Sequence, residues 1–465
     1  MSFQDIRKFA KLSAAAERAA LDIYERLPLS LRYHLFFSAD FFRWSALLKE
    51  SDDWDRDRLN DYLIEQTKDL LTHAMKHIPY YRDRFSDAGF KPEKIQSLED
   101  LKVLPYLSKE DVRDDPAKIV DERIPLRSLK KKQTGGSSGI PLILYLNKES
   151  QDIFHAFRNS ILGRIGHTPK SREVMLWHYI KLGNKNVNFT KYGNRLVLSM
   201  QYLTKERLTK YVDMVQEFQP EYILGYPSWL TVFSSHVKQY KLSPFRHIKA
   251  VITYSETLLS TQRELLEESF NCRVFSMFGM NERAAIGGEC EKSAGIHFHP
   301  LFGLIEFADT VEGYKEIVAT GFTNYAMPFI KYRSGDIVRE HKKSCRHCGR
   351  QHKVVGTLEG RIQEFLIDKD YTLINIRPLW IADFPNVLQC QFFQDQPGKV
   401  LMKIVPSKIF SKNDEVLIKK HLGEIMGPRN DAMDIELIIV DHIRRSSAGK
   451  IIMIEQKMDL RGLFY

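Results

Sequence analysis

From about residue 130 onward, short runs of β-branched and aromatic residues alternate with amphipathic stretches of helical spacing. Four apolar runs have the length of buried strands: 142–146, 174–178, 250–254 and 274–278. The stretches predicted as helices are 151–166, 205–218, 229–241 and 260–269, after an earlier one at 55–77. Such alternation places helices against parallel or mixed sheets, so we predict an α/β fold of layered sheets and helices.

The pattern changes after Gly360. Residues 400–405 and 435–440 are predicted strands on either side of a helix at 412–426, which indicates a small α+β module of about 100 residues. We therefore predict a large N-terminal domain, residues 1–361, and a small C-terminal domain, residues 362–465. A chain of 465 residues is long enough for two to four domains.

Composition narrows the class of protein only moderately. Hydrophobic residues make up 43% and charged residues 28%, which excludes a disordered chain, a collagen-like repeat and a disulfide scaffold. The net charge of +10 permits nucleotides, nucleic acids or a membrane surface as partners without selecting one. Five cysteines form a sparse set typical of a reducing compartment, so we expect a cytoplasmic protein.

The N-terminal region predicts neither a membrane span nor an export signal. No run of 18 apolar residues occurs, and the first twenty residues lack an apolar core. The aromatic stretch 31–44 is expected to pack on the main body, with peripheral contact with a membrane as the alternative.

A loop rich in glycine and hydroxyl residues precedes the strand at 142–146. Glycines let successive backbone N–H groups point at one anion, and hydroxyl groups add donors, so the loop predicts phosphate binding. It is not a Walker A loop, because Ile140 and Pro141 follow where a lysine would be needed. The alternative is a flexible hairpin turn. The loop residues are Thr134, Gly135, Gly136, Ser137, Ser138 and Gly139.

Further segments follow in a fixed order: Phe-Gly-Met-Asn-Glu at 278–282, Tyr-Arg-Ser-Gly-Asp at 332–336, Gly-Arg at 360–361 and RRSSAGK at 444–450. Together with the loop, they resemble the superfamily of adenylate-forming enzymes. Segments 225–230, 254–259, 324–336 and 345–350 are similar to the phenylacetate–CoA ligase branch, above all its capsule-polysaccharide biosynthesis subgroup. The resemblance extends from about residue 45 to residue 455.

The resemblance implies a two-step reaction. A carboxylic acid attacks the α-phosphate of MgATP, giving an acyl-adenylate and pyrophosphate, and the acyl group then passes to coenzyme A. Adenylation motifs do not encode the acceptor, so other second steps remain open. The acyl group could pass to an amine on a sugar or to a carrier thiol, or AMP itself could be transferred to a cofactor hydroxyl. The glycine-rich loop would hold the β- and γ-phosphates.

By the same resemblance, Glu282 would bind Mg²⁺, a cation that prefers oxygen ligands. Phe278 would offer an aromatic face to adenine and Asn281 would donate to the α-phosphate, although the family more often has Tyr-Gly and then Thr or Ser before this glutamate. The alternative for Glu282 is a solvated residue at a helix start.

Asp336 is expected to accept hydrogen bonds from both ribose hydroxyls, and Arg361 to reach the phosphate or the ribose. Ser255 and Glu256 match the segment that borders adenine and substrate. The alternatives are a turn aspartate, a surface arginine and a purely structural glutamate.

Lys450 would approach the α-phosphate only when the C-terminal domain closes as a lid, where its ammonium would neutralise developing charge. Taken alone, it would be an ordinary surface lysine. The family hinge lies just after the Gly-Arg pair and is often an aspartate, whereas this chain has Gln363 and Glu364 there.

Cys345 and Cys348 form a C-x-x-C knuckle, and Cys290 with His297 could supply two more ligands of a tetrahedral zinc. Some members of the branch carry zinc at similar positions, so we predict structural zinc. His299 and His347 are alternative candidates for the histidine ligand. A redox-active pair or two free thiols are the alternatives.

The other cysteines, Cys272 and Cys390, have no partner pattern and are predicted to be small buried hydrophobes.

The aromatic residues Tyr226 and Trp229, with Trp177, suggest a pocket for the acid, although aromatics near strands are more often core. A rival class is a zinc-ribbon nucleic-acid-binding protein, because residues 339–353 carry six Lys/Arg against one Glu. A catalytically idle relative is a third possibility. The sequence names neither the acid nor the oligomeric state.

Overall fold

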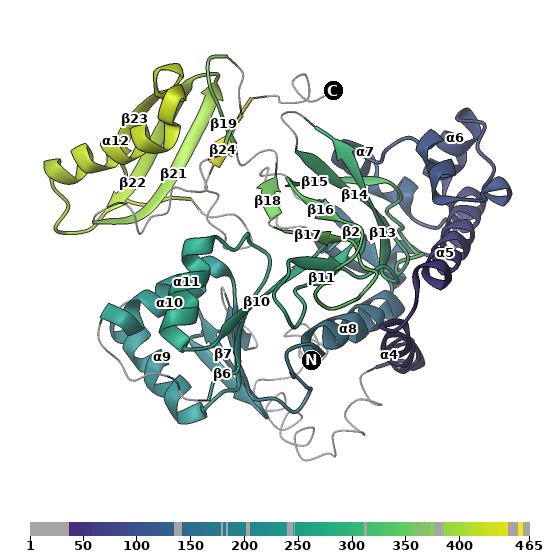
Figure 1. The fold of residues 1–465 in the computed structure, drawn as a ribbon, viewed down its shortest axis with the longest axis horizontal. Coiled ribbons are helices and arrows are strands. Elements are labelled where there is room, and N and C mark those ends of the chain that lie inside the picture. The colour runs from purple at the N-terminus through teal and green to yellow at the C-terminus, as the bar shows by residue number, and fades with distance from the viewer. Residues whose placement is uncertain are drawn as a thin grey trace.

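The computed structural model describes residues 37–458, apart from 134–141, 178–179, 183–184, 201–204, 240–244, 246, 311–313, 357, 362–364, 371–372, 376–383, 385 and 445–453. Within these ranges the chain forms mixed layers of sheets and helices (Figure 1), which confirms the predicted α/β class.

A ten-stranded sheet is the largest element. Its five central strands run parallel in the order β10, β9, β8, β3, β7. Antiparallel strands extend both edges. The parallel strands are β3 (Glu173–Trp177), β7 (Arg195–Ser199), β8 (Tyr222–Gly225), β9 (Ala250–Thr253) and β10 (Arg273–Gly279). The added strands are β6 (Phe189–Tyr192) on one side, and β11 (Ile286–Gly288), β12 (Ile296–Phe298), β17 (Val354–Val355) and β16 (His341–Lys342) on the other.

Helices connect the parallel strands and cover both faces of the sheet. On one face, Ile223, Val251 and Val274 pack into a core with α9 (Lys205–Phe218), α10 (Pro227–Gln239) and α11 (Ser260–Phe270). Their neighbours along the strands face the other side, where α8 (Lys148–Gly163) contributes to a second core. Strands buried on both faces read as continuous apolar runs, which is why the sequence predicted β3, β9 and β10, whereas β7 and β8 were not predicted. Each of these helices begins and ends within three residues of its predicted bounds.

A second, antiparallel sheet carries residues of the candidate site. Its strands are β13 (Gly303–Asp309), β14 (Lys315–Gly321), β15 (Tyr332–Val338) and β18 (Leu358–Arg361). The hairpin of β1 (Lys130–Gln133) and β2 (Ile143–Leu146) flanks the glycine-rich loop, and β2 buries only alternate residues. A further short hairpin joins β4 (Ile180–Leu182) and β5 (Lys185–Val187).

The N-terminal helices are α4 (Ala39–Ser51), α5 (Arg56–His77), α6 (Pro79–Asp87) and α7 (Lys109–Asp114). Helix α4 buries Phe41, Trp44 and Leu48, and the Trp44 ring lies 5.2 Å from that of Phe157 on α8. This packing confirms the expectation for residues 39–44; residues 31–36 lie outside the described chain. Among the helices that the structure describes, none has the length and apolarity that crossing a bilayer requires. Short 3₁₀ turns occur at Pro92–Lys94, Leu98–Val103, Pro116–Ile119, Leu126–Ser128 and Gly427–Ala432.

The C-terminal region has a hydrophobic core of its own. Four strands in the order β23, β22, β21, β24 pack against α12 (Lys412–Met426), which matches its predicted bounds. This separate core supports the predicted division at residues 361–362, which stays a prediction. The strands are β21 (Val387–Gln396), β22 (Lys399–Pro406), β23 (Asp434–Ile439) and β24 (Ile454–Gln456), preceded by the hairpin of β19 (Phe365–Ile367) and β20 (Leu373–Asn375).

Candidate functional site

The candidate site lies where neighbouring parallel strands end. Gly225, Thr253 and Ser276 are adjacent in the register of β8, β9 and β10. The residues that follow them therefore share one edge of the sheet. In α/β folds, ligands bind at this carboxyl edge.

An aromatic group occupies this edge. The ring of Tyr226 stacks on Trp229 with centroids 4.1 Å apart, and Tyr254 meets Tyr226 edge-on at 5.6 Å. The hydroxyl of Tyr254 is buried and has no hydrogen-bond partner within the described residues. Trp177, at the end of β3, packs against Met175 and Val197. Tyr226 and Trp229 are thus buried in the core on one face of the sheet, with Tyr254 packed against Tyr226.

Ser255 and Glu256 follow β9 and adjoin the aromatic group. Ser255 has a φ of 67°, a left-handed conformation that costs a non-glycine residue strain. Burial and the charge of Glu256 together raise the pKa of Tyr226 to about 12, against the opposing effect of a hydrogen bond with Ser255. The structure therefore places both predicted residues beside Tyr226.

Phe278 lies near the end of β10, and the turn that follows the strand carries Asn281 and Glu282. The ring of Phe278 meets that of Phe298 edge-on, with centroids 5.3 Å apart. Asn281 is exposed. The hydroxyl of Tyr332, on β15 of the second sheet, donates to Oε1 of Glu282 at 3.2 Å. Sequence reasoning assigned no role to Tyr332, although it begins the same motif that ends in Asp336.

Asp336 lies on β15, directly opposite Arg361 of β18 in the register. The preceding Gly335 has a φ of 74°, and a Cβ atom there would lie 2.8 Å from Nζ of Lys109. The backbone N–H of Asp336 donates to Oγ of Ser334 at 3.0 Å. Strand β15 thus contains a left-handed residue at Gly335, which favours glycine, and Asp336 after it carries a partly exposed carboxylate opposite Arg361 in the register.

Several predicted residues lie outside the described chain. They are the glycine-rich loop from Thr134 to Gly139, the lid residue Lys450, and the hinge candidates Gln363 and Glu364.

The four predicted metal ligands lie together. One donor atom from each of Cys290, His297, Cys345 and Cys348 falls within 4.8 Å of the others, and three of the four residues are buried. Nε2 of His297 is 3.5 Å from Sγ of Cys348, while Nδ1 of the same ring contacts the carbonyl of Gly295 at 2.9 Å. That second contact fixes the tautomer, as in second shells of metal sites. Burial lowers the pKa of His297 to about 4, so its ring is neutral.

The knuckle has tight local geometry. The N–H of Gly349 donates to the carbonyl of Cys345 at 3.0 Å, and the N–H of Cys345 donates to that of Arg350 at 3.2 Å. Gly349 has a φ of 78°, which the turn requires. The donor set of three thiols and one imidazole in a buried place fits tetrahedral zinc.

The competing histidines lie elsewhere. His347 is exposed on the knuckle, outside the four-residue group. His299 belongs to a second group, with Asp52 and His352. Cys390 is part of the C-terminal core, where burial raises its pKa to about 12, and Cys272 is half-buried with a pKa raised to about 12 by the same cause.

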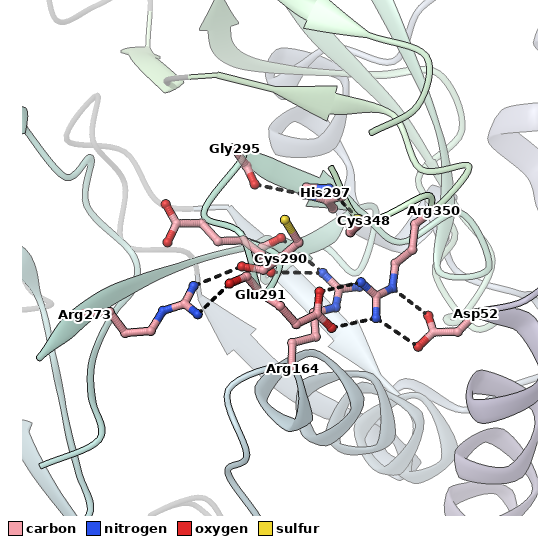
Figure 2. A network of polar contacts seen from close by, with 11 residues as sticks. Asp52, Arg164, Arg273, Cys290, Glu291, Gly295, His297, Cys348 and Arg350 are labelled. Atoms are coloured by element: carbon pink, nitrogen blue, oxygen red, sulfur yellow. Dashed lines mark hydrogen bonds and ion pairs between the residues drawn. The ribbon is translucent and has the colours of Figure 1, made fainter. Parts of the chain in front are cut away.

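A network of arginines surrounds the four-residue group (Figure 2). Arg350 donates to Glu291 at 2.7 and 2.8 Å and to Asp52 at 3.1 and 3.4 Å. The hydrogen bonds from Arg350 lower the pKa of Glu291 to about 2. Arg164 donates to the carbonyls of Gly288 and Glu289 at 3.2 Å each. The knuckle is thereby tied to the end of α4 and to the chain around Cys290.

Contacts within the chain also weaken the hypothesis of a nucleic-acid-binding protein. Of the six cations at 339–353, Arg350 pairs with two carboxylates, Arg339 donates to the hydroxyl of Tyr314 at 2.5 Å, and Lys353 donates to the carbonyl of Ile305. Half of the basic run is therefore committed to contacts within the chain rather than presented to phosphates.

Comparison with known proteins agrees with this architecture. Residues 374–457 match the family model of the CapK C-terminal domain. Protein CapK of Staphylococcus aureus is 22% identical over 92% of this chain and 96% of its own length. Phenylacetate-coenzyme A ligase of Pseudomonas putida is 23% identical over 73% of this chain and 78% of its own. The solved structure of 2-hydroxyisobutyryl-CoA ligase superposes with a TM-score of 0.68 at 16% identity, covering 89% of this chain and 92% of that one.

The fold is therefore that of the adenylate-forming ligases. In sequence, the chain is similar to CapK and to the phenylacetate-CoA ligases, the branch that its ordered motifs indicated.

Proposed function

We propose that this chain activates a carboxylic acid with ATP, forming an acyl-adenylate and pyrophosphate, and then transfers the acyl group to coenzyme A. One observation carries the proposal: Glu282 follows the parallel sheet, Asp336 lies on the antiparallel sheet, and Tyr332 links the two through its hydrogen bond to Glu282. This contact joins the two sheets that carry the two carboxylates, which come from segments far apart in the sequence.

The residues divide the work of nucleotide binding. The partly exposed carboxylate of Glu282 is an oxygen donor of the kind Mg²⁺ prefers, and Tyr332 orients it. Asp336 would accept hydrogen bonds from the ribose hydroxyls, with Arg361 opposite it in the register. Bound magnesium would offset the negative charge of the phosphates during the displacement.

The remaining roles rest on the family motifs. Residues Thr134–Gly139 would bind the β- and γ-phosphates, Phe278 would face adenine, and Asn281 would donate to the α-phosphate. Lys450 would approach the α-phosphate when the C-terminal domain, residues 362–465, closes over the large domain.

The acid is expected to be an aryl or acyl carboxylate that packs against Tyr226 and Trp229. Both rings are almost fully buried, with 7% and 5% of their surfaces exposed, and they stack on each other. An apolar wall favours an apolar acid, because its contact area is removed from water.

Coenzyme A is supported as acceptor by the names of the relatives, which include phenylacetate-coenzyme A ligase and 2-hydroxyisobutyryl-CoA ligase. The sequence resemblance to the capsule-polysaccharide biosynthesis subgroup favours a second candidate acceptor, an amine on a sugar. A carrier thiol, or transfer of AMP itself to a cofactor hydroxyl, completes the alternatives.

We further propose that Cys290, His297, Cys345 and Cys348 hold one structural zinc ion. The support is the donor set, its burial and the fixed tautomer of His297. Four protein ligands would leave no position for a substrate, so this ion would stabilise the knuckle and take no part in the reaction.

A panel of carboxylic acids tests the proposal. The purified protein is incubated with MgATP and each acid, with and without coenzyme A, and pyrophosphate release and thioester are measured. We expect acid-dependent pyrophosphate release, followed by thioester only when coenzyme A is present. Pyrophosphate release without thioester would leave adenylation standing and replace coenzyme A by another acceptor. Absence of acid-dependent release across the panel, from protein that binds ATP, would contradict the proposal.

A further inference from the structure

Three polar side chains from distant parts of the chain converge beside the proposed zinc site. Asp52 lies at the end of α4, His299 follows β12 and His352 precedes β17. One donor atom from each residue lies within 4.8 Å of the other two. The rings of His299 and His352 have centroids 4.9 Å apart.

The two histidines are buried without the partners that such groups normally have. His299 is 1% exposed and His352 is 4% exposed. Neither ring nitrogen of His299, nor Nδ1 of His352, has a hydrogen-bond partner within the described residues. Buried polar side chains are nearly always paired, so unpaired ring nitrogens in a shared place indicate a missing occupant.

The group is separate from the four-residue group at Cys345. One ring contact joins the two groups: the rings of His297 and His352 have centroids 6.3 Å apart. Each group has its own donors: three thiols and an imidazole in one, two imidazoles and a carboxylate in the other. Two ions could therefore lie side by side without sharing a ligand.

The charge around the group permits a cation. Arg164 and Arg350 are the nearby positive charges, and Asp52 and Glu291 balance them. If the neighbouring site holds zinc as proposed, its three thiolates outweigh the ion by one negative charge. The surroundings are then net negative before a second ion binds. The carboxylate of Asp52 has lone pairs for both Arg350 and a metal, and its contacts with Arg350 are longer than those of Glu291.

We propose that Asp52, His299 and His352 form a second metal site, which binds a divalent transition ion such as Zn²⁺. Two imidazoles and one carboxylate are a common donor set for such ions and leave a coordination position for water. The bound ion would connect the end of α4 to the strands β12 and β17. This inference uses the proposed zinc site only in the charge balance and does not depend on the ligase activity.

Metal counting tests the inference. Wild-type protein is stripped with a chelator, loaded with excess zinc, freed of loose metal by gel filtration and analysed by mass spectrometry. We expect about two zinc ions per chain in the wild type and about one in His299→Asn and in His352→Asn. His347→Asn is the matched control, because that histidine is exposed on the same knuckle and should leave two ions bound.

Cobalt distinguishes which ion is lost. Thiolate-bound Co²⁺ gives a strong charge-transfer absorption that nitrogen- and oxygen-bound Co²⁺ lacks. His299→Asn should keep this absorption and lose one equivalent of cobalt, whereas Cys345→Ser should lose the absorption.

A measurement on wild-type crystals covers the case in which the variants fail to fold. After zinc loading, anomalous scattering at the zinc edge should give a peak among Asp52, His299 and His352. A water molecule without anomalous signal there, or a wild type that takes up a single metal ion bound through thiolates, would overturn the inference. Neither measurement involves ATP or a carboxylic acid, so a negative result for the second metal site would leave the proposed ligase function untested and unaffected.

Discussion

At the scale of single residues, the candidate site depends on backbone conformations that most side chains disfavour. Ser255, Arg283 and Gly335 have φ values of 67°, 62° and 74°, and each lies next to a predicted site residue. Left-handed conformations cost non-glycine residues about 1 kcal/mol or more, so the surrounding structure must hold them. Strained turns of this kind concentrate at functional sites.

Replacing Asp336 tests the nucleotide site most directly. Asp336→Ala should weaken ATP binding by about 2–3 kcal/mol, because hydrogen bonds to a charged acceptor would be lost. Isothermal calorimetry measures this effect. Asp309→Ala is the control, since that aspartate is on the same sheet and exposed. Equal ATP affinity in the two variants would remove Asp336 from the site.

A buried histidine on α8 should make stability depend on pH. Burial holds the pKa of His155 well below its ordinary value of 6.5. In the unfolded chain it binds a proton as pH falls below about 6.5, whereas in the folded chain it does not, so the stabilising difference is present above that pH and is lost below it. Between about pH 7.5 and pH 5.5, the wild type should lose about 1.4 kcal/mol more than His155→Gln.

Denaturant unfolding at the two pH values measures this difference. His347→Gln, at an exposed position, should behave as the wild type does. An identical pH dependence in His155→Gln and wild type would show that His155 titrates normally in the folded chain.

At the scale of elements, the knuckle around Cys345 joins parts of the chain that are far apart in sequence. Arg350 pairs with Asp52, 298 residues away, and with Glu291 beside Cys290. A metal at the four-residue group would therefore stabilise the contact between α4 and the sheet as well as the knuckle itself.

Cys345→Ser should lower the zinc content by about one ion per chain and lower the melting temperature by roughly 5 °C or more, because binding free energy is folding free energy at a structural site. Metal analysis and calorimetry measure the two effects. Cys272→Ser, at a cysteine outside the group, should leave the zinc content unchanged. A well-folded native protein without zinc would exclude the site.

Some helices and strands could be predicted from the sequence, and others could not. Helices α9 and α12 have their predicted bounds, because apolar spacing within one helix is a local signal. The antiparallel sheet of β13, β14 and β15 was not predicted, since its strands alternate with turns and no crossover helices mark them.

The site shows the same limit. The residues Cys290, His297, Cys345 and Cys348 could be grouped from cysteine spacing and family resemblance. The hydrogen bond from Tyr332 to Glu282 and the group of Asp52, His299 and His352 depend on tertiary contacts that no local pattern encodes.

At the scale of the whole molecule, two hydrophobic cores cover the faces of the large sheet, and a third belongs to the C-terminal region. The phosphate loop, Glu282 and Asp336 lie in the first 361 residues, whereas Lys450 lies in the last 104. The proposed reaction therefore requires the C-terminal domain to approach the large one for adenylation.

Lys450→Ala should leave ATP binding nearly intact and slow acyl-adenylate formation about 100-fold or more, the effect of one lost charge contact in the transition state. A pre-formed acyl-adenylate should restore the second step in this variant. Rapid-quench assays measure the rates of adenylate formation and of acyl transfer separately. Lys457→Ala, in the same region, should keep both rates. Wild-type adenylation by Lys450→Ala would make this lysine an ordinary surface residue.

The central claim is that the chain forms an acyl-adenylate, and exchange of labelled pyrophosphate into ATP measures that step without knowledge of the acceptor. We predict exchange that requires both Mg²⁺ and a carboxylic acid, and that Glu282→Gln reduces about 100-fold. Folded wild-type protein that binds ATP, yet shows no acid-dependent exchange with any aryl or acyl acid supplied, would contradict the account.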